Sequence, residues 1–277
     1  MTRRPPLAGV IGWPVGHSRS PRLHGHWLRR HGIDGYYVPI GLAPEEFLSG
    51  LAALPGLGFR GVNVTIPHKE AALAAAREVS PIAARVGAAN TLTFLPDGGF
   101  HADNTDGYGF IESLRQDAPG WTAAAGPALV LGAGGAARAV IAALIDAGAP
   151  EVRLANRTRA RAEQLAEGLG GPITVVAWDE ASAAADGAAT IVNTSALGMV
   201  GQPPLDVRLD AAPPGALVND IVYQPLVTPL LAAAAARGLR TVDGLGMLLH
   251  QAVPGFERWF GTKPRVDADL RAAVLAE

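Results

Sequence analysis

One segment in the middle of the chain constrains the fold more than any other. The apolar run Ala128–Leu131 is typical of a buried strand, and residues 132–137, Gly-Ala-Gly-Gly-Ala-Ala, follow it at once. Gly132, Gly134 and Ala137 take the small positions of a Gly-x-Gly-x-x-Gly/Ala turn, which permit a tight turn, close approach to a pyrophosphate, and helix–strand packing. The following helix start offers N–H groups to phosphates. We predict a dinucleotide-binding βαβ unit; a glycine-rich turn that binds no nucleotide is the alternative.

The end of the next predicted strand, Val152–Ala155, indicates which dinucleotide is bound. It runs into Asn156-Arg-Thr-Arg-Ala-Arg161 and offers no carboxylate, whereas NAD-binding proteins usually present Asp or Glu there to the ribose 2′-OH. Guanidinium groups instead bind a 2′-phosphate through charge-assisted forks. The arginines also oppose the dipole of the helix that they begin, unless an anion lies against them. We therefore expect NADP(H), with a solvated helix start as the alternative.

Short apolar runs alternate with helical patterns along the rest of the chain, which is typical of an α/β protein with mainly parallel sheets. The predicted strands are 7–11, 36–40, 61–65, 91–94, 99–102, 128–131, 152–155, 173–177, 189–192 and 216–220. The predicted helices include 44–54, 69–78, 108–117, 135–147, 159–168 and 229–237.

A length of 277 residues favours two domains. We expect an N-terminal mixed-sheet substrate domain of residues 1–105 and a Rossmann-like NADP-binding domain of residues 106–244. The helix-rich tail, 245–277, contains no strand of its own, so we expect it to pack back on the first domain and complete it.

Composition excludes several classes of partner and site. A net charge of −2 gives no basic footprint for nucleic acid. The chain has no cysteine, which rules out disulfides, a thiolate nucleophile and Cys-type zinc sites and fits a reducing compartment. The first apolar run is too short for a signal peptide, and no stretch is long enough to span a membrane. We expect a cytoplasmic protein that binds neither nucleic acid nor membrane, and no metal site.

Polar residues follow two of the predicted strands of the first domain. If the segment after the first strand is extended, Ser18 and Ser20 point the same way and could hold a carboxylate, although Ser20 before Pro21 is equally consistent with a helix N-cap. Asn63 and Thr65 share one face of a strand that ends where open α/β sheets bind ligands.

Two charged residues are candidates for proton transfer. Lys69 falls in the first turn of a predicted helix, where a cation is electrostatically disfavoured, so a chemical role competes with an exposed surface lysine. Asp106 lies at the predicted domain boundary, just before a helix. Its position suggests a functional role, and an ordinary N-cap is the alternative.

Taken together, the motifs resemble those of the shikimate dehydrogenase family, which interconverts 3-dehydroshikimate and shikimate. The resemblance covers nearly the whole length in order: 17–21, 63–69, 87–91, 104–107, the glycine turn at 132, 156–158, 193–199, 220–223, 228–231 and 244–251. It implies an NADP-dependent oxidoreductase of chorismate and aromatic amino acid biosynthesis, acting on a small molecule as a monomer or homodimer.

The resemblance also assigns roles to residues. It implies Lys69 and Asp106 as the catalytic pair. The substrate-binding residues would be Ser18, Ser20 and Tyr223 on the carboxylate, with Asn63, Thr65, Asn90 and Gln251 around the ring hydroxyls. The cofactor-binding residues would be Gly132, Ala133, Gly134, Gly135, Ala136, Asn156, Arg157, Thr158, Arg161, Thr194, Ile221 and Gly244.

The chain departs from the family pattern at Gly25, where the family often has Asn, and at Pro81, where relatives can present a polar cofactor contact. Neither departure touches the implied catalytic pair. The paired serines resemble the shikimate-type pattern, since a threonine in the second place is more typical of relatives that also take quinate.

In the implied mechanism, hydride passes between the nicotinamide and the ring while Lys69, hydrogen-bonded to Asp106, gives or takes the proton. Two alternatives remain open. One is a relative with the same fold that acts on quinate or an amino analogue, with NAD in place of NADP. The other is a non-catalytic dinucleotide-binding module.

Overall fold

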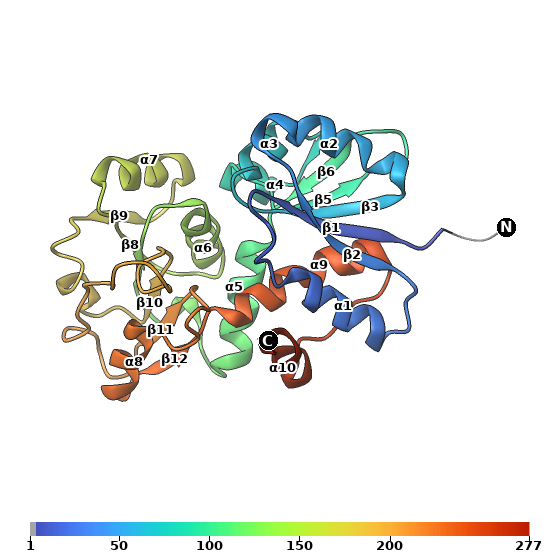
Figure 1. The fold of residues 1–277 in the computed structure, drawn as a ribbon. Coiled ribbons are helices and arrows are strands. Elements are labelled where there is room, and N and C mark those ends of the chain that lie inside the picture. Colours follow the sequence, from blue (N-terminus) through green and yellow to red (C-terminus); the bar gives the residue numbers. More distant parts are fainter. Residues whose placement is uncertain (1–3, 277) are drawn as a thin grey trace. The chain divides into compact units, whose positions relative to one another are not determined.

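Two six-stranded sheets organise the residues 4–276 that the computed structural model describes (Figure 1). Each sheet belongs to its own compact unit. The first unit contains the chain up to Thr105 and again from Gln251 onward, and the second contains Asp106–His250. The two-domain α/β fold class expected from the sequence is confirmed.

The sheet of the first unit is mixed, with strand order β2-β1-β3-β5-β6-β4. Its strands are β1 (Leu7–Gly12), β2 (Tyr36–Gly41), β3 (Phe59–Val64), β4 (Glu78–Val79), β5 (Thr91–Phe94) and β6 (Phe100–Asp103). β1 pairs in parallel with β2 and β3, β5 runs antiparallel to both β3 and β6, and β4 pairs in parallel with β6. The carboxyl ends of β1, β3 and β6 therefore lie at the same sheet edge as the start of β5.

Helices cover both faces of this sheet, and Figure 1 shows α2 and α3 on one side with α1 and α9 on the other. The helices are α1 (Ser20–Arg30), α2 (Phe47–Ala53, between short turns at 44–46 and 55–57), α3 (Lys69–Ala74), α4 (Pro81–Val86), α9 (Leu245–Phe260) and α10 (Ala268–Leu275). Alternation along β3 sets the two faces. Val62 and Val64 pack into the apolar cluster with α2, whereas Asn63 contacts Tyr37 on the opposite face.

The C-terminal helices complete the first unit, as expected. The Trp259 indole N–H donates to the Leu92 carbonyl at 3.0 Å, and the Trp27 indole N–H donates to the Arg265 carbonyl at 3.0 Å. An ion pair of 2.5 Å joins Arg30 to Asp267, the N-cap of α10. Through these bonds and the aromatic packing around Phe256, α9 packs on the sheet beside α1.

Gly61 is required by the packing of α9 on this sheet. A Cβ added at Gly61 would overlap the indole of Trp259 and the carbonyl of Leu92. Gly61→Ala must push α9 away from the sheet or break the Trp259–Leu92 bond. We expect it to lower the free energy of unfolding by about 3 kcal/mol, the upper part of the range for overpacking. Urea denaturation measures this, with Gly56→Ala, at an open position, as the control; equal stability of the two variants would contradict the packing argument.

The sheet of the second unit is entirely parallel, with order β12-β11-β10-β7-β8-β9. Its strands are β7 (Ala128–Leu131), β8 (Val152–Ala155), β9 (Ile173–Val176), β10 (Thr190–Asn193), β11 (Leu217–Asp220) and β12 (Arg240–Val242). Its helices are α5 (Asp106–Asp117), α6 (Gly135–Asp146), α7 (Arg159–Leu169) and α8 (Pro229–Ala236), with short turns at 123–125 and 183–185. This is the Rossmann strand order, and its switch point lies between β7 and β10.

Some elements differ from those expected. The helix predicted for residues 69–78 ends at Ala74, because Arg77 and Ser80 donate backbone N–H groups to Phe100 and Ala102. The intervening residues form β4, a two-residue edge strand too short to be recognised in the sequence. β12, of three residues, was not predicted either.

The second unit extends to His250, so the chain passes back to the first unit inside α9. The first turns of α9 belong with α5 of the second unit. Gly246 lies so close to Ser113 that an added Cβ would overlap its side chain, and His250 Nε2 lies 2.7 Å from Gln116 Oε1. Helix α9 therefore starts directly after Gly244, and its first turns belong to the second unit.

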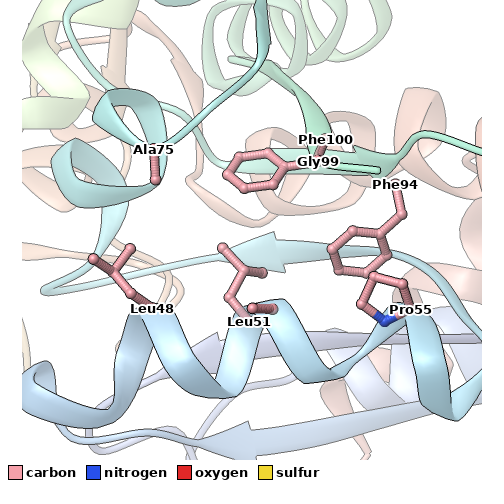
Figure 2. Close-up of a pocket in the computed structure, with 8 residues that line it drawn as sticks. Leu48, Leu51, Pro55, Ala75, Phe94, Gly99 and Phe100 are labelled. Carbon is pink, nitrogen blue, oxygen red and sulfur yellow. The ribbon is translucent and has the colours of Figure 1, made fainter. Parts of the chain in front are cut away.

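An apolar cavity of about 380 Å³ lies in the first unit (Figure 2). Leu48, Leu51 and Pro55 line it from α2 and the following turn, and Phe94 and Phe100 line it from β5 and β6. Its lining offers no polar side chain to a polyhydroxylated acid or a nucleotide. Across residues 4–276, no helix is both long and apolar enough to cross a membrane.

Candidate functional site

The glycine turn of the second unit has the local geometry that its sequence predicts. Gly132 has φ of 110°, and a Cβ there would lie 2.9 Å from Thr194 Oγ1, so glycine is required on both counts. Gly134 is the N-cap of α6, and neither it nor Gly135 has any atom within 4 Å of an added Cβ. Ala137 is fully buried against the sheet. Open space over the helix start leaves its N–H groups accessible to a phosphate.

The residues around this turn hold it in place. The Thr194 hydroxyl donates to the Leu131 carbonyl at 2.9 Å and approaches the Gly132 carbonyl at 3.3 Å, which ties the end of β10 to the turn after β7. Ala133 and Ala136 are half-buried, and no acidic residue occupies the first turn of α6. The turn therefore combines exposed N–H groups with small side chains at the switch point of the sheet, and these features fit a dinucleotide.

The segment after β8 carries the predicted cluster of arginines. Thr158 is the N-cap of α7, and the Asn156 amide donates to the Thr158 carbonyl at 2.8 Å. Arg159 forms a 2.7 Å ion pair with Glu163, one helical turn on, so its guanidinium already has a partner within its own helix. Within residues 4–276, Arg157 and Arg161 are exposed and no ion pair is described for either. These two arginines fit a bound phosphate.

The far side of the switch point contains a buried carboxylate. Asp220 ends β11 and accepts hydrogen bonds from Asn193 (3.0 Å), Thr228 (2.7 Å) and the backbone of Val222 (3.0 Å). Burial raises the pKa of Asp220 although these donors oppose the shift. The network fixes the turn that contains Ile221. Gly244 packs directly on this turn, since an added Cβ would overlap the Ile221 carbonyl.

In the first unit, the serine segment lies at the start of α1. Ser20 is the first helical residue and Arg19 the N-cap, so the structure does not place Ser20 at the N-cap. Ser18 Oγ accepts a 3.3 Å hydrogen bond from the Ser20 backbone N–H. Ser18 is half-buried and Ser20 is buried. The two hydroxyls therefore lie near one helix start, where an anionic group is favoured.

Asn63 is more fully engaged by the protein than the sequence suggested. Its Oδ1 accepts from the Tyr37 hydroxyl at 2.7 Å, and its Nδ2 donates to the Asn90 carbonyl and Thr91 Oγ1, both at 3.1 Å. Burial raises the pKa of Tyr37 well above its usual value, so the phenol remains a donor. Asn63 therefore joins β3 to the start of β5. Because its side chain is already bound by the protein, it is better placed to support Asn90 than to bind substrate.

Asn90 is the centre of the hydrogen-bond network at this edge. Its Oδ1 accepts from the Thr105 backbone N–H (2.9 Å), the Thr105 hydroxyl (3.1 Å) and the Thr91 hydroxyl (3.0 Å). Its Nδ2 donates to Gln251 Oε1 at 3.3 Å. Two of the predicted substrate-binding side chains, Asn90 and Gln251, are therefore in direct contact, although they are far apart in sequence.

Lys69 is the first residue of α3, and its neighbours fix its backbone. Its carbonyl accepts from the Ala89 N–H at 2.9 Å, beside Asn90. The preceding His68 is buried, stacks on Phe47 at 4.4 Å, and its Nε2–H donates to the Leu42 carbonyl at 2.8 Å. Thr65, half-buried, begins the same segment directly after β3. Lys69 thus starts its helix at the edge where the hydroxyls and amides gather.

Asp106 and Tyr223 belong to the second unit. Asp106 is buried and begins α5, one residue after the Thr105 backbone that Asn90 holds. Gly107 lies against α6, where a Cβ would come within 2.9 Å of the Ala139 carbonyl. Tyr223 is half-buried and follows the Asp220 turn.

Sequence reasoning missed several residues that support the site. Tyr37 and His68 each orient a segment that carries a predicted site residue, and His24 lies against Tyr37 with parallel rings 3.8 Å apart. The periodicity of a strand or helix shows that a position is buried but not which polar atom it meets. His68 had one available signal, its position directly before Lys69. No metal-binding group of three or more His, Cys, Asp or Glu side chains occurs within residues 4–276.

His24 is expected to make stability depend on pH. It is fully buried, its ring nitrogens lack hydrogen-bond partners among the described residues, and burial lowers its pKa from 6.5 to about 3. Between these values the unfolded chain binds more protons than the folded one, so stability falls as pH falls. We expect the His24 contribution to lower the free energy of unfolding by about 2 kcal/mol from pH 7 to pH 5. Urea titrations of wild type and His24→Phe measure it; an equally steep decline in the variant would show that His24 is not the cause.

Sequence models of three families match the chain in order. They are described as shikimate dehydrogenase substrate binding domain (residues 10–92), shikimate/quinate 5-dehydrogenase (118–200) and shikimate 5′-dehydrogenase C-terminal domain (244–274). The chain is 61% identical to the shikimate dehydrogenase (NADP⁺) of Paracoccus denitrificans over 271 residues, which cover 98% of this chain and 96% of the relative.

Two solved structures are similar over nearly their whole length. Quinate dehydrogenase from Corynebacterium glutamicum in complex with NAD is 30% identical, with a TM-score of 0.90, and the match covers 98% of this chain and 99% of that one. Shikimate 5-dehydrogenase from Thermus thermophilus in complex with NADP(H) and shikimate is 38% identical, with a TM-score of 0.86 and coverage of 97% and 98%.

Proposed function

Because the chain belongs to the shikimate dehydrogenase family, we propose that it catalyses the reversible, NADP-dependent reduction of 3-dehydroshikimate to shikimate. One observation carries the proposal. Side chains with hydroxyl or amide groups and a single lysine converge on one edge of the first sheet, from the ends of β1, β3 and β6 and the start of β5. A ring acid with several hydroxyl groups needs such an edge, since each hydroxyl requires a fixed partner.

We assign substrate to the first unit. Ser18 and Ser20, at the start of α1, would bind the carboxylate; Tyr223, which the resemblance also assigns to the carboxylate, belongs to the second unit. Thr65, Asn90 and Gln251 would bind ring hydroxyls, and the Asn90–Gln251 hydrogen bond would set their spacing. Asn63 would act mainly by holding Asn90, because its amide already binds Tyr37, Thr91 and the Asn90 carbonyl.

We assign NADP(H) to the second unit, where it supplies or takes up the hydride when bound. The backbone N–H groups at the start of α6, next to Gly134 and Gly135, would bind the pyrophosphate. The small side chains of Ala133 and Ala136 would leave room for it. Arg157 and Arg161 would bind the 2′-phosphate beside Asn156 and Thr158. Thr194 would fix the turn, and Ile221 and Gly244 would lie near the nicotinamide.

Lys69 and Asp106 would carry the proton transfer. In the reductive direction the Lys69 ammonium donates a proton to the ketone oxygen as negative charge develops on it, and in the oxidative direction the amine takes the proton back. Asp106 would orient Lys69 and accept a hydrogen bond from the ring hydroxyl that is formed or oxidised. Fixed positions of these groups lower the barrier because no reorganisation is needed during reaction.

The absence of cysteine fits a reducing compartment, and we propose that the enzyme works in the cytoplasm, as a monomer or homodimer. Quinate is the rival substrate, because a quinate dehydrogenase is among the similar structures. We still favour NADP over NAD, because residues 156–161, which follow β8, include three arginines and no carboxylate.

Product analysis tests the proposal. The purified protein is given 3-dehydroshikimate and NADPH deuterated at nicotinamide C4, and the product is examined by NMR. We expect shikimate with one deuterium on the carbon that carried the ketone. A product other than shikimate, or shikimate without deuterium from either C4 epimer of the cofactor, would overturn the proposed reaction.

A further inference from the structure

An ion pair between a buried carboxylate and an exposed arginine lies at the same sheet edge and has no part in the assignments above. Arg258, on α9, places Nη2 2.6 Å from Oδ2 of Asp103, the last residue of β6. The other oxygen of Asp103 accepts from the Ser80 hydroxyl at 2.6 Å and from the Asn104 backbone N–H at 2.8 Å. Only 10% of the Asp103 side chain is exposed, whereas 36% of the Arg258 side chain is, so Arg258 covers the carboxylate from the solvent side.

The charge of Asp103 is secured by these contacts. Burial alone would raise the pKa of Asp103, but hydrogen bonds from Ser80 and Arg258 and the positive charge of Arg258 outweigh it and lower the pKa. The carboxylate therefore stays ionised, and a charged carboxylate in this position costs energy unless Arg258 remains beside it.

The segment after Asp103 leads directly to the proposed catalytic carboxylate. Asn104 is held at its backbone by Asp103 and at its side chain, whose amide donates to the Ala88 carbonyl at 2.9 Å. Thr105 is held by Asn90. Asp106 follows at once, so the position where its backbone starts is set by three consecutive anchored residues, of which Asp103 is the first.

The helix that supplies Arg258 also supplies Gln251. The two residues are 258 − 251 = 7 positions apart on α9, which is two helical turns, so they share one face of the helix. Gln251 accepts from Asn90 while Arg258 binds Asp103. These two contacts, one of them from a proposed substrate ligand, therefore join α9 to the sheet in addition to the Trp259–Leu92 bond.

We propose that the Asp103–Arg258 ion pair, seated on Ser80, is a positioning device for the reaction: it fixes the strand end that leads to Asp106 against the helix that carries Gln251. This rests on the roles proposed above for Asp106 and Gln251. Neither Asp103 nor Arg258 touches the reacting atoms. They affect turnover only through the residues that they hold. When the pair is broken, the strand end before Asp106 is no longer fixed to the helix that carries Gln251.

Steady-state kinetics of three variants test the proposal. Arg258→Met removes the charge and keeps most of the aliphatic stem, and Arg258→Lys keeps the charge. Arg77→Met is the matched control, because Arg77 forms a 2.7 Å ion pair with Asp97 in the same unit, at the turn end of the same β5–β6 hairpin. Circular dichroism and thermal melting accompany each variant, and Asp103→Asn replaces Arg258→Met if that variant does not fold.

We expect Arg258→Met to lower kcat by about tenfold and to raise the KM for shikimate severalfold, while the KM for NADP⁺ stays within about twofold of wild type. Arg258→Lys should recover most of the loss, and Arg77→Met should retain wild-type kcat even where it melts earlier. A kcat for Arg258→Met within twofold of wild type, an equal loss in Arg77→Met, or no recovery with lysine would overturn the positioning role alone. No shikimate oxidation by the wild-type enzyme would overturn the proposed function, and this inference with it.

Discussion

Lys69→Ala is expected to lower kcat by about 10³-fold, within the range that a single general acid–base residue contributes, with little change in the KM for shikimate. The reason is chemical rather than structural. The position of Lys69 depends on its backbone bond to Ala89 and on the anchoring of His68, and alanine preserves both. In shikimate oxidation the variant lacks the amine that takes the proton from the ring hydroxyl, and water at the same place is a poorer and unpositioned acceptor.

Lys263 provides the control for this experiment. The chain has two lysines, Lys69 and Lys263, and Lys263 is exposed after α9. Lys263→Ala should retain wild-type kcat and KM. Initial rates of NADPH formation over a range of shikimate concentrations separate the two parameters. If Lys69→Ala instead raises KM strongly at unchanged kcat, Lys69 only binds substrate and the proposed proton transfer is wrong.

The double variant Arg157→Ala/Arg161→Ala is expected to reduce the preference for NADP⁺ over NAD⁺ by between about 10² and 10⁴ in kcat/KM, since each charge-assisted hydrogen bond to a phosphate contributes roughly 1.5–3 kcal/mol. The loss should appear in the KM for NADP⁺. Turnover with NAD⁺ should hardly change, because NAD⁺ has no 2′-phosphate for these arginines to bind.

Arg159→Ala is the matched control for the double variant. Arg159 lies in the same turn, but it is bound to Glu163 at 2.7 Å, so it has less charge to offer a phosphate. We expect it to keep the wild-type preference. An equal loss of preference in Arg159→Ala would show that net positive charge near α7 matters rather than contacts from Arg157 and Arg161.

The elements of the second unit could be predicted from the sequence because their signals are local. β7 and β8 begin and end where the apolar runs do, and α6 starts at Gly135 as the glycine turn requires. A parallel sheet buries both of its faces, so its strands appear in the sequence as short uninterrupted apolar runs. Elements that depend on pairing with a distant strand, such as β4, leave no such signal.

The candidate site was predicted less completely, and the reason is also physical. Motifs and resemblance identified Asn90 and Gln251, but their direct hydrogen bond depends on how α9 packs on the sheet. Tyr37, His24 and Asp103 were not predicted at all. Each is defined by a partner far away in sequence, and hydrophobic periodicity carries no information about the partner of a buried polar atom.

The most direct test of the central assignment is nicotinamide reduction by the purified protein in four combinations, shikimate or quinate with NADP⁺ or NAD⁺. We predict that shikimate with NADP⁺ gives a kcat/KM well above those of the other three. A higher value with quinate or with NAD⁺ would contradict the assigned specificity while leaving the chemistry in place. Absence of turnover in all four combinations would contradict the enzyme assignment itself and favour a dinucleotide-binding module.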